Sequence, residues 1–112
     1  MQYGEIWFVN FGDTGVGHEY RNTRPALIIE ANEKIHICKM ITLIAFSSKI
    51  NNRISDDIFV TKNLTNGLFK DSLIKVQHIT SFDTKRFINK IGVLDEENLG
   101  KVKKYLKVHF NV

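Results

Sequence analysis

The chain opens with GEIWFVNF at residues 4–11 and continues, beyond a loop, with RPALII at residues 24–29. Both runs are rich in aliphatic and aromatic residues, which favours two β-strands. Large apolar side chains fall on both faces of the first run, so this strand should be covered on both sides. The two runs therefore predict the start of a small, strongly curved sheet.

Arg24 stands at the junction between the loop and the second strand. It precedes Pro25, the only proline in the chain, and a proline restricts both its own backbone and that of its predecessor, so the junction should be stiff. The loop at residues 12–23 has three glycines and a cluster of polar side chains: His18, Glu19, Tyr20 and Arg21. Because loops held by rigid strands often carry function, we interpret this segment as a candidate anion-binding site. The alternative is an ordinary polar surface loop.

These side chains suit phosphate chemistry. The planar, permanently charged guanidinium of Arg24 can donate two parallel hydrogen bonds to one phosphate. His18 can exchange a proton near neutral pH, and Tyr20 can stack on an unpaired base.

The rest of the chain predicts further strands at residues 36–48, 58–61, 72–79 and 87–94, the first of them long and bent. Residues 95–108 change to a helical period. Asp95 can cap this helix, acidic residues follow it, and lysines gather at the far end, as the helix dipole favours. We expect a single domain over residues 1–112, mainly β (α+β), in which the helix closes the sheet.

The composition is that of a small basic protein. Sixteen Lys and Arg against twelve Asp and Glu give a net charge of +4, which favours a polyanionic partner. Cys38 is the only cysteine and has no internal partner, which fits a reducing compartment. No leader and no apolar run of membrane-spanning length is present, so we expect a cytoplasmic protein with no membrane association.

Two further groups of polar residues are candidates for substrate contact. Ser47, Ser48 and Lys49 end the long strand and offer hydroxyls and a cation, although serines also end strands for local reasons. Lys75 and Gln77 share one face of a strand and could line a groove or face solvent.

Metal and cofactor chemistry has little support in the sequence. His36 and Cys38 share a face of the long strand, but two ligands do not make a zinc site and no CxxC or HxxxH pair supplies more. Nucleotide-binding and serine-hydrolase motifs are absent from the sequence. We therefore expect no metal and no cofactor.

Taken together, several segments resemble the MazF/PemK/Kid toxins of bacterial type II toxin–antitoxin systems. The likeness spans nearly the whole chain, and the order of the pieces is more specific than any one of them. They are GEIWF at 4–8, GHE at 17–19, RPALII at 24–29, GLFKDSLI at 67–74, ITSFDTKR at 79–86 and KIGVLDEE at 90–97.

The resemblance implies an SH3-like, partly open β-barrel of the MazF/Kid/CcdB type with a C-terminal helix, assembled as a homodimer. It implies a metal-independent endoribonuclease that cuts single-stranded mRNA at a short sequence. Attack by the 2′-hydroxyl would give a 2′,3′-cyclic phosphate and a 5′-hydroxyl. A cognate antitoxin with an acidic, flexible tail would be the protein partner, which the net positive charge suits.

The resemblance also assigns roles to residues. Arg24 corresponds to the family's arginine before proline, for phosphate stabilisation and as a candidate to protonate the leaving oxygen. Ser47 corresponds to the family's Ser/Thr, with Ser48 one register step away, and His18 to the histidine of the Kid branch, a candidate base or positioning group.

One departure from the Kid branch affects the base. That branch has an arginine and an aspartate where this chain has Lys75 and Gln77. Glutamine cannot accept a proton as a carboxylate can, so the base must be His18 or Glu19, or the substrate must organise the reaction without a strong base. We expect Glu19, Tyr20, Arg21, Ser48, Lys49, Lys75 and Gln77 to bind substrate.

Two alternatives share this fold. A gyrase inhibitor of the CcdB type acts through an aromatic C-terminal tail, for which Phe110 is a poor substitute. An RNA-binding module without turnover is consistent with the glutamine at position 77.

Overall fold

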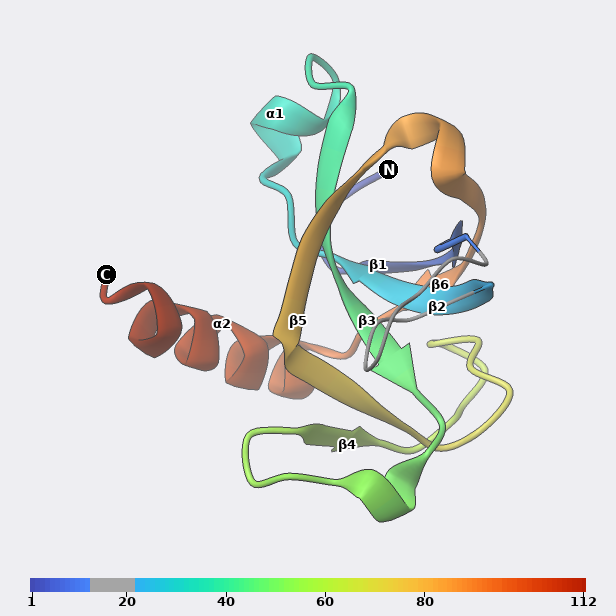
Figure 1. Ribbon diagram of the computed structural model, residues 1–112, viewed down its shortest axis with the longest axis vertical. Helices are drawn as coiled ribbons and strands as arrows, with labels where there is room; N and C mark the ends of the chain where they lie inside the picture. Colours follow the sequence, from blue (N-terminus) through green and yellow to red (C-terminus); the bar gives the residue numbers. More distant parts are fainter. Residues whose placement is uncertain (13–21) are drawn as a thin grey trace.

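The computed structural model describes residues 1–12 and 22–112. Within these ranges one antiparallel sheet has six strands in the order β4-β5-β3-β2-β1-β6. The strands are β1 (Glu5–Asn10), β2 (Thr23–Ile28), β3 (Met40–Ser47), β4 (Ile58–Val60), β5 (Ser72–Asp83) and β6 (Phe87–Val93). The helices are α1 (Asn32–Ile35) and α2 (Glu96–Phe110), with short 3₁₀ turns at Ile50–Asn52 and Thr84–Arg86. The sheet curls into a partly open barrel with α2 along one side, which confirms the predicted fold class (Figure 1).

Both faces of the sheet are buried in its central part. Leu27 of β2 packs in a cluster beside Val102 of α2, whereas its neighbour Ile28 packs in a second cluster on the other face. In β1, Ile6 belongs to the first cluster and Val9 to the second, and both are fully buried. A strand buried on both faces needs apolar residues at consecutive positions, which confirms the prediction from the first run.

The predicted strand at residues 36–48 is wrong in its first four residues. The strand β3 begins at Met40, and His36 instead ends the one-turn helix α1. Two contacts hold the helix α1 in place. The side chain of Asn32 accepts a hydrogen bond from the Tyr3 backbone N–H at 2.6 Å, and Ile35 is buried in the second cluster. His36 and Cys38 therefore do not share a strand face.

Strand β5 is longer than predicted and sharply bent. Ile44 of β3 pairs with Ile79, but Phe46, two residues on, pairs with Ile74. The four residues at 75–78 therefore bulge opposite a single residue of β3, and a bulge of this kind bends a strand and redirects its side chains. The bend divides β5 into an upper half beside β3 and a lower half that also pairs with β4 (Figure 1).

The gap between the edge strands β4 and β6 is closed by the turn at residues 63–67. The Val93 backbone N–H donates to the Thr65 carbonyl at 3.0 Å. Gly67 has a φ of +68°, and a Cβ there would lie 1.9 Å from the Ile91 carbonyl oxygen. A Cβ at Gly92 would lie 2.4 Å from the Thr65 carbonyl oxygen. The backbones meet so closely that only glycine fits at both positions.

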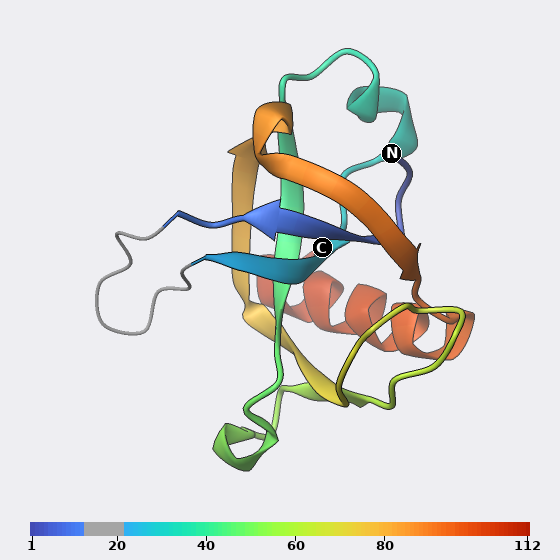
Figure 2. The same ribbon diagram turned by 90° about the vertical axis from the view of Figure 1, so that its right-hand side faces the viewer.

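Helix α2 follows the prediction from its capping pattern. The carboxylate of Asp95 accepts a hydrogen bond from the Asn98 backbone N–H at 3.0 Å. Val102, near the middle of the helix, is fully buried and packs on the first core cluster. Figure 2 shows the helix from another side, with α2 below the paired strands β1 and β2 in that view. None of the helices in residues 1–12 and 22–112 has the length and apolar character needed to cross a membrane.

The glycine contacts predict opposite effects of one substitution at two positions. Gly92→Ala should destabilise the protein by about 2 kcal/mol because its methyl group would overlap backbone atoms. Gly100→Ala should instead stabilise α2 by about 1 kcal/mol, since open space surrounds this helical glycine. Urea unfolding followed by circular dichroism measures both, and similar midpoints for the two variants would contradict the closed gap.

Candidate functional site

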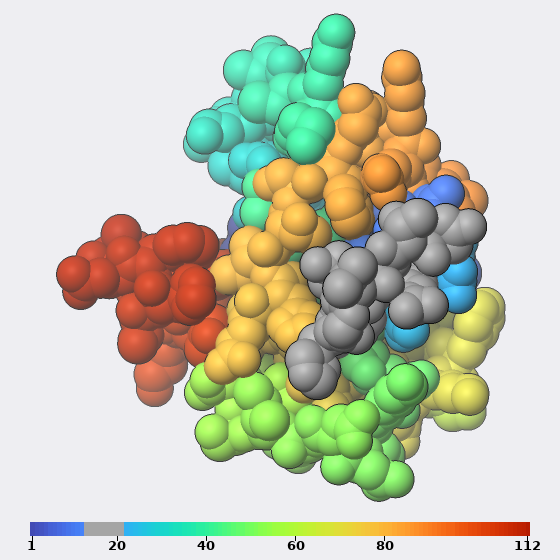
Figure 3. Space-filling model, in the orientation of Figure 1, coloured from blue at the N-terminus to red at the C-terminus, as the bar shows by residue number. Residues whose placement is uncertain are grey.

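A cavity of about 380 Å³ lies between the start of β2 and the segment that precedes β5. Arg24 lines it from β2, Ser48 from just beyond β3, Phe69 and Lys70 from the segment before β5, and Ser72 from the first position of β5. In the space-filling view the yellow segment around residues 68–70 lies next to the blue start of β2 (Figure 3). Segments far apart in the sequence therefore supply a cation, hydroxyls and an aromatic ring to one hollow.

The backbone around Arg24 explains why the cavity opens here. Arg24 pairs with Val9, and Pro25 with Phe8, so β1 flanks both on one side. Pairing of β2 with β3 begins only at Ala26. Pro25 therefore lies just outside the β2–β3 ladder, where its missing N–H interrupts no strand pairing. The half-buried Arg24 is held on a paired strand and faces the cavity.

The two serines at the end of β3 differ in their surroundings. Ser47 is 7% exposed, and its hydroxyl oxygen accepts a hydrogen bond from the Lys49 backbone N–H at 3.2 Å. Ser48 is exposed and lines the cavity with Arg24. Lys49 is exposed at the start of the 3₁₀ turn and is not part of the cavity lining. The structure thus brings Ser48 to the same hollow as Arg24, with Ser47 buried one position before it.

Lys75 is held by a carboxylate. Its Nζ lies 2.5 Å from Oδ2 of Asp57, and the two side chains are 13% and 1% exposed. The same oxygen accepts a hydrogen bond from the Ile54 backbone N–H at 3.0 Å. The other oxygen, Oδ1, is buried with no hydrogen-bond partner within the described ranges. The ammonium is therefore the main compensation for a buried negative charge.

Gln77 makes a second contact with the same loop. Its Nε2 donates to Oδ2 of Asp56 at 3.0 Å. Gln77 also forms a hydrogen bond with the hydroxyl of Tyr105 on α2. Burial and the charge of Asp56 raise the pKa of this hydroxyl, and the hydrogen bond with Gln77 lowers it in part. Lys75 and Gln77 do share a face, as predicted, but this face contacts the segment before β4.

Four predicted site residues lie outside the described residues: His18, Glu19, Tyr20 and Arg21. Of the predicted residues that the structure does describe, Arg24 and Ser48 share the cavity. The roles assigned to all of them stay predictions.

Most residues of the cavity lining were not predicted from the sequence, and the aromatic rings and the lysine among them matter most. Phe8, Phe69 and Lys70 line the cavity, and Phe69 is 74% exposed. The signal that could have found Phe69 and Lys70 is an aromatic residue and a lysine shortly after the Asn66-Gly67 turn, because turn-borne polar and aromatic residues often bind ligands.

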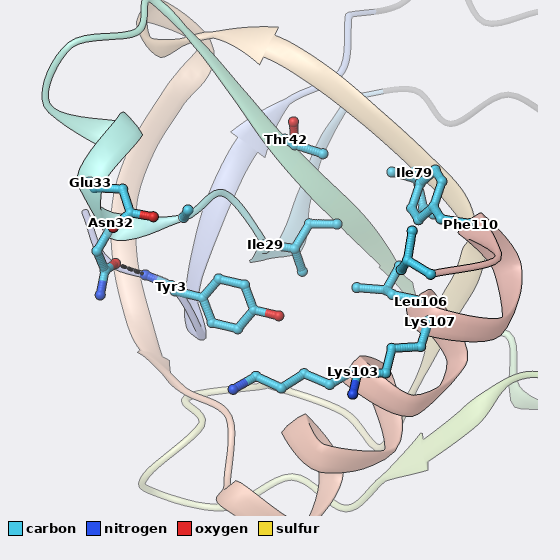
Figure 4. A pocket seen from close by; sticks show the side chains of 12 residues that line it. Tyr3, Ile29, Asn32, Glu33, Thr42, Ile79, Lys103, Leu106, Lys107 and Phe110 are labelled. Carbon is cyan, nitrogen blue, oxygen red and sulfur yellow. Dashed lines mark hydrogen bonds between the residues drawn. The ribbon is translucent and has the colours of Figure 1, made fainter.

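A second, larger groove of about 700 Å³ separates the end of α2 from Tyr3, β3 and β5 (Figure 4). Apolar side chains such as Ile29, Ile79 and Leu106 line it. Lys103 lies at its edge, with Nζ 5.2 Å from the centroid of the Tyr3 ring. This groove contains none of the described residues that were predicted to bind substrate.

The protein is thus a small, partly open β-barrel with a C-terminal helix and a cavity lined by Arg24 and Lys70. A family model described as the PemK-like, MazF-like toxin of type II toxin–antitoxin systems matches residues 2–110. The chain belongs to this toxin family. No curated protein sequence matches it.

Solved structures of MazF proteins share the fold. MazF from Deinococcus radiodurans superposes with a TM-score of 0.83 at 17% identity, covering 100% of this chain and 97% of that one. The toxin MazF-mt6 from Mycobacterium tuberculosis gives 0.76 at 14% identity, with 96% and 97% covered. A MazE–MazF complex from D. radiodurans gives 0.75 at 17% identity, with 98% and 94% covered.

The buried pair predicts a large difference between two neighbouring substitutions on β5. Lys75→Met should destabilise the protein by about 3 kcal/mol, because it leaves the Asp57 carboxylate buried and unpaired. Gln77→Met, which removes the hydrogen bonds of an exposed side chain to Asp56 and Tyr105, should cost only about 1 kcal/mol. Equilibrium unfolding in urea measures the free energy of unfolding of both variants. Equal losses of stability would show that the Lys75–Asp57 pair stabilises the protein no more than an exposed hydrogen bond does.

Proposed function

We propose that this protein is an endoribonuclease toxin that cuts single-stranded mRNA at a short sequence without a metal ion. Membership of the PemK/MazF toxin family supports this. The observation that carries it is the cavity where Arg24, held on a paired strand, shares one hollow with Ser48 and Lys70. A fixed guanidinium beside hydroxyl donors suits a phosphodiester whose negative charge grows during reaction.

The proposed reaction is an internal transfer. The 2′-oxygen of the substrate attacks the adjacent phosphorus while its proton passes to a base, and the bond from phosphorus to the 5′-oxygen breaks. The leaving oxygen takes up a proton, so the products are a 2′,3′-cyclic phosphate and a 5′-hydroxyl. A base near the 2′-oxygen, an acid near the leaving oxygen and donors around the phosphoryl oxygens are required.

The roles follow the chemistry of the residues. Arg24 would stabilise the phosphoryl oxygens and is the candidate to protonate the leaving oxygen. Ser48, which lines the cavity, would donate a hydrogen bond to the same group, whereas the buried Ser47 would help to hold the backbone of that turn. His18 or Glu19 would serve as the base. Lys75 would act mainly by holding the segment before β4, since its ammonium compensates the buried Asp57.

The proposed partners fit the charge of the protein. A cognate antitoxin would cover the cavity with an acidic, flexible tail, which the net charge of +4 favours. The MazE–MazF complexes of D. radiodurans support such a partner for a protein of this family. We further propose that the toxin is a homodimer and acts in the cytoplasm, where mRNA is available.

Removal of the guanidinium tests the proposed role of Arg24. Arg24→Ala should lower the rate of RNA cleavage roughly 100- to 1000-fold, the usual cost of losing one donor to a developing anion. The measurement is a time course of transcript fragments on a gel. Arg86→Ala is the matched control, because Arg86 is exposed on the turn before β6 and contacts Asn10 instead of lining the cavity. Equal rates for the two variants would contradict the proposal.

The reaction chemistry makes a separate prediction. Cleavage should continue at the same rate in EDTA, and the 5′ ends should accept a label from polynucleotide kinase without prior phosphatase treatment. Loss of cleavage in EDTA that magnesium restores, or 5′-phosphate ends, would overturn the mechanism. Retention of RNA on the protein without any fragments would instead identify a binding module.

A further inference from the structure

We propose that Phe69, supported by Phe8, is a stacking platform for one unpaired base of the RNA substrate, and that Lys70 binds the adjoining phosphate. This inference rests on the proposed function. The two aromatic rings lie 5.6 Å apart between centroids, at an angle of 37°. Both line the cavity that contains Arg24.

The exposure of Phe69 has no structural explanation in the barrel core. Its side chain is 74% exposed, whereas its neighbour Leu68 is 6% exposed and belongs to the first core cluster. Leu68 therefore anchors the segment, and the ring of Phe69 is directed away from the core. An apolar ring left in water at the mouth of a basic cavity is a surface that a flat apolar ligand can cover.

Hydrogen bonds on both sides of Phe69 hold its backbone in place. The side-chain oxygen of Asn66 accepts from the Leu68 backbone N–H at 3.0 Å. The hydroxyl of Ser72 donates to the Lys70 carbonyl at 2.9 Å, and Asp71 accepts from the Lys62 backbone N–H at 2.9 Å. A ring presented by a fixed backbone loses little entropy when a base stacks on it.

The charges around the ring select the occupant. Arg24 and Lys70 line the cavity, and none of the described residues that line it is Asp or Glu. The ligand must therefore combine a flat apolar face with negative charge on each side. A nucleotide in a single strand has this combination, because each base has a π-face and each linkage carries a phosphate.

The position of the platform gives it a role in specificity. Arg24 would hold the scissile phosphate, and Phe69, from a different segment that lines the same cavity, would hold a base nearby. Stacking fixes the register of the strand, so the identity of the stacked base affects which linkage reaches Arg24. Phe69 is thus a positioning residue whose loss should change KM and cleavage-site choice more than the chemical step.

The test uses Arg24→Ala protein as the common background, because it should cut RNA slowly enough for binding to be measured before cleavage, and a fluorescent RNA that spans a mapped cleavage site. The additional change Phe69→Ala should weaken binding roughly tenfold or more, measured by anisotropy, whereas Phe69→Tyr should restore it. Phe110→Ala is the matched control, since Phe110 is also more than half exposed but lies on α2. Lys70→Ala should weaken binding to all RNAs and lower the salt dependence by about one ion.

A scan with abasic RNA separates stacking from a general structural effect. Each nucleotide near the cleavage site is replaced in turn by one that lacks its base. At one position the abasic RNA should bind equally well to the Arg24→Ala protein with and without the additional Phe69→Ala change, because the stacked base is already missing. A Phe69→Ala effect of the same size at every position would overturn the stacking role.

Other outcomes distinguish a failure of this inference from a failure of the proposed function. Normal cleavage by the otherwise unchanged protein with no effect of Phe69→Ala on binding or KM would overturn this inference and leave the proposed function intact. RNA that binds through Phe69 but is never cut would overturn the proposed nuclease and support the platform. Unchanged RNA binding together with loss of binding to an acidic antitoxin-tail peptide would show that the ring serves a protein partner, and would overturn the inference.

Discussion

The close approach of the turn at residues 63–67 to strand β6 is the constraint on which the rest of the barrel depends. The backbones meet where a side chain at Gly67 or Gly92 would overlap carbonyl groups, and a hydrogen bond from Val93 to Thr65 joins them. This contact bridges the two edge strands that the sheet itself leaves apart. It also fixes the start of the segment that carries Phe69 and Lys70, so closure of the barrel and the shape of the cavity have the same origin.

The bulge in β5 separates the positive charges into two groups. It directs Lys75 to the buried carboxylate of Asp57, and Gln77 to Asp56 and the helix. Arg24 and Lys70 instead line a cavity without acidic lining residues in the described chain. The net charge of +4 is therefore not spread evenly over the surface. Lys75 compensates the buried carboxylate of Asp57, whereas Arg24 and Lys70 line a hollow where an anion can bind.

The elements that could be predicted from the sequence are those with a strong local pattern. The helix after Asp95 follows from its cap and its apolar spacing, and β1 and β2 follow from their apolar runs. The failure at residues 36–39 has a long-range cause, because Asn32 binds the backbone of Tyr3 and the adjacent Ile35 enters the core. Contacts between residues almost thirty positions apart leave no local signal.

Arg24 and its stiff junction could be recognised from the adjacent proline alone, because proline restricts the backbone of its neighbours in any fold. The residues that share the cavity with Arg24 could not be predicted in this way. Ser48, Phe69 and Lys70 reach the same cavity only because β3 ends beside β2 and the turn at residues 63–67 packs on β6. Likewise, the pairing of Lys75 with Asp57 depends on a register shift that no periodicity reveals. The stiffness of the chain at one residue depends on the adjacent residues and can be predicted from the sequence. The composition of a cavity depends on which distant strands pack together, and only the tertiary structure decides that.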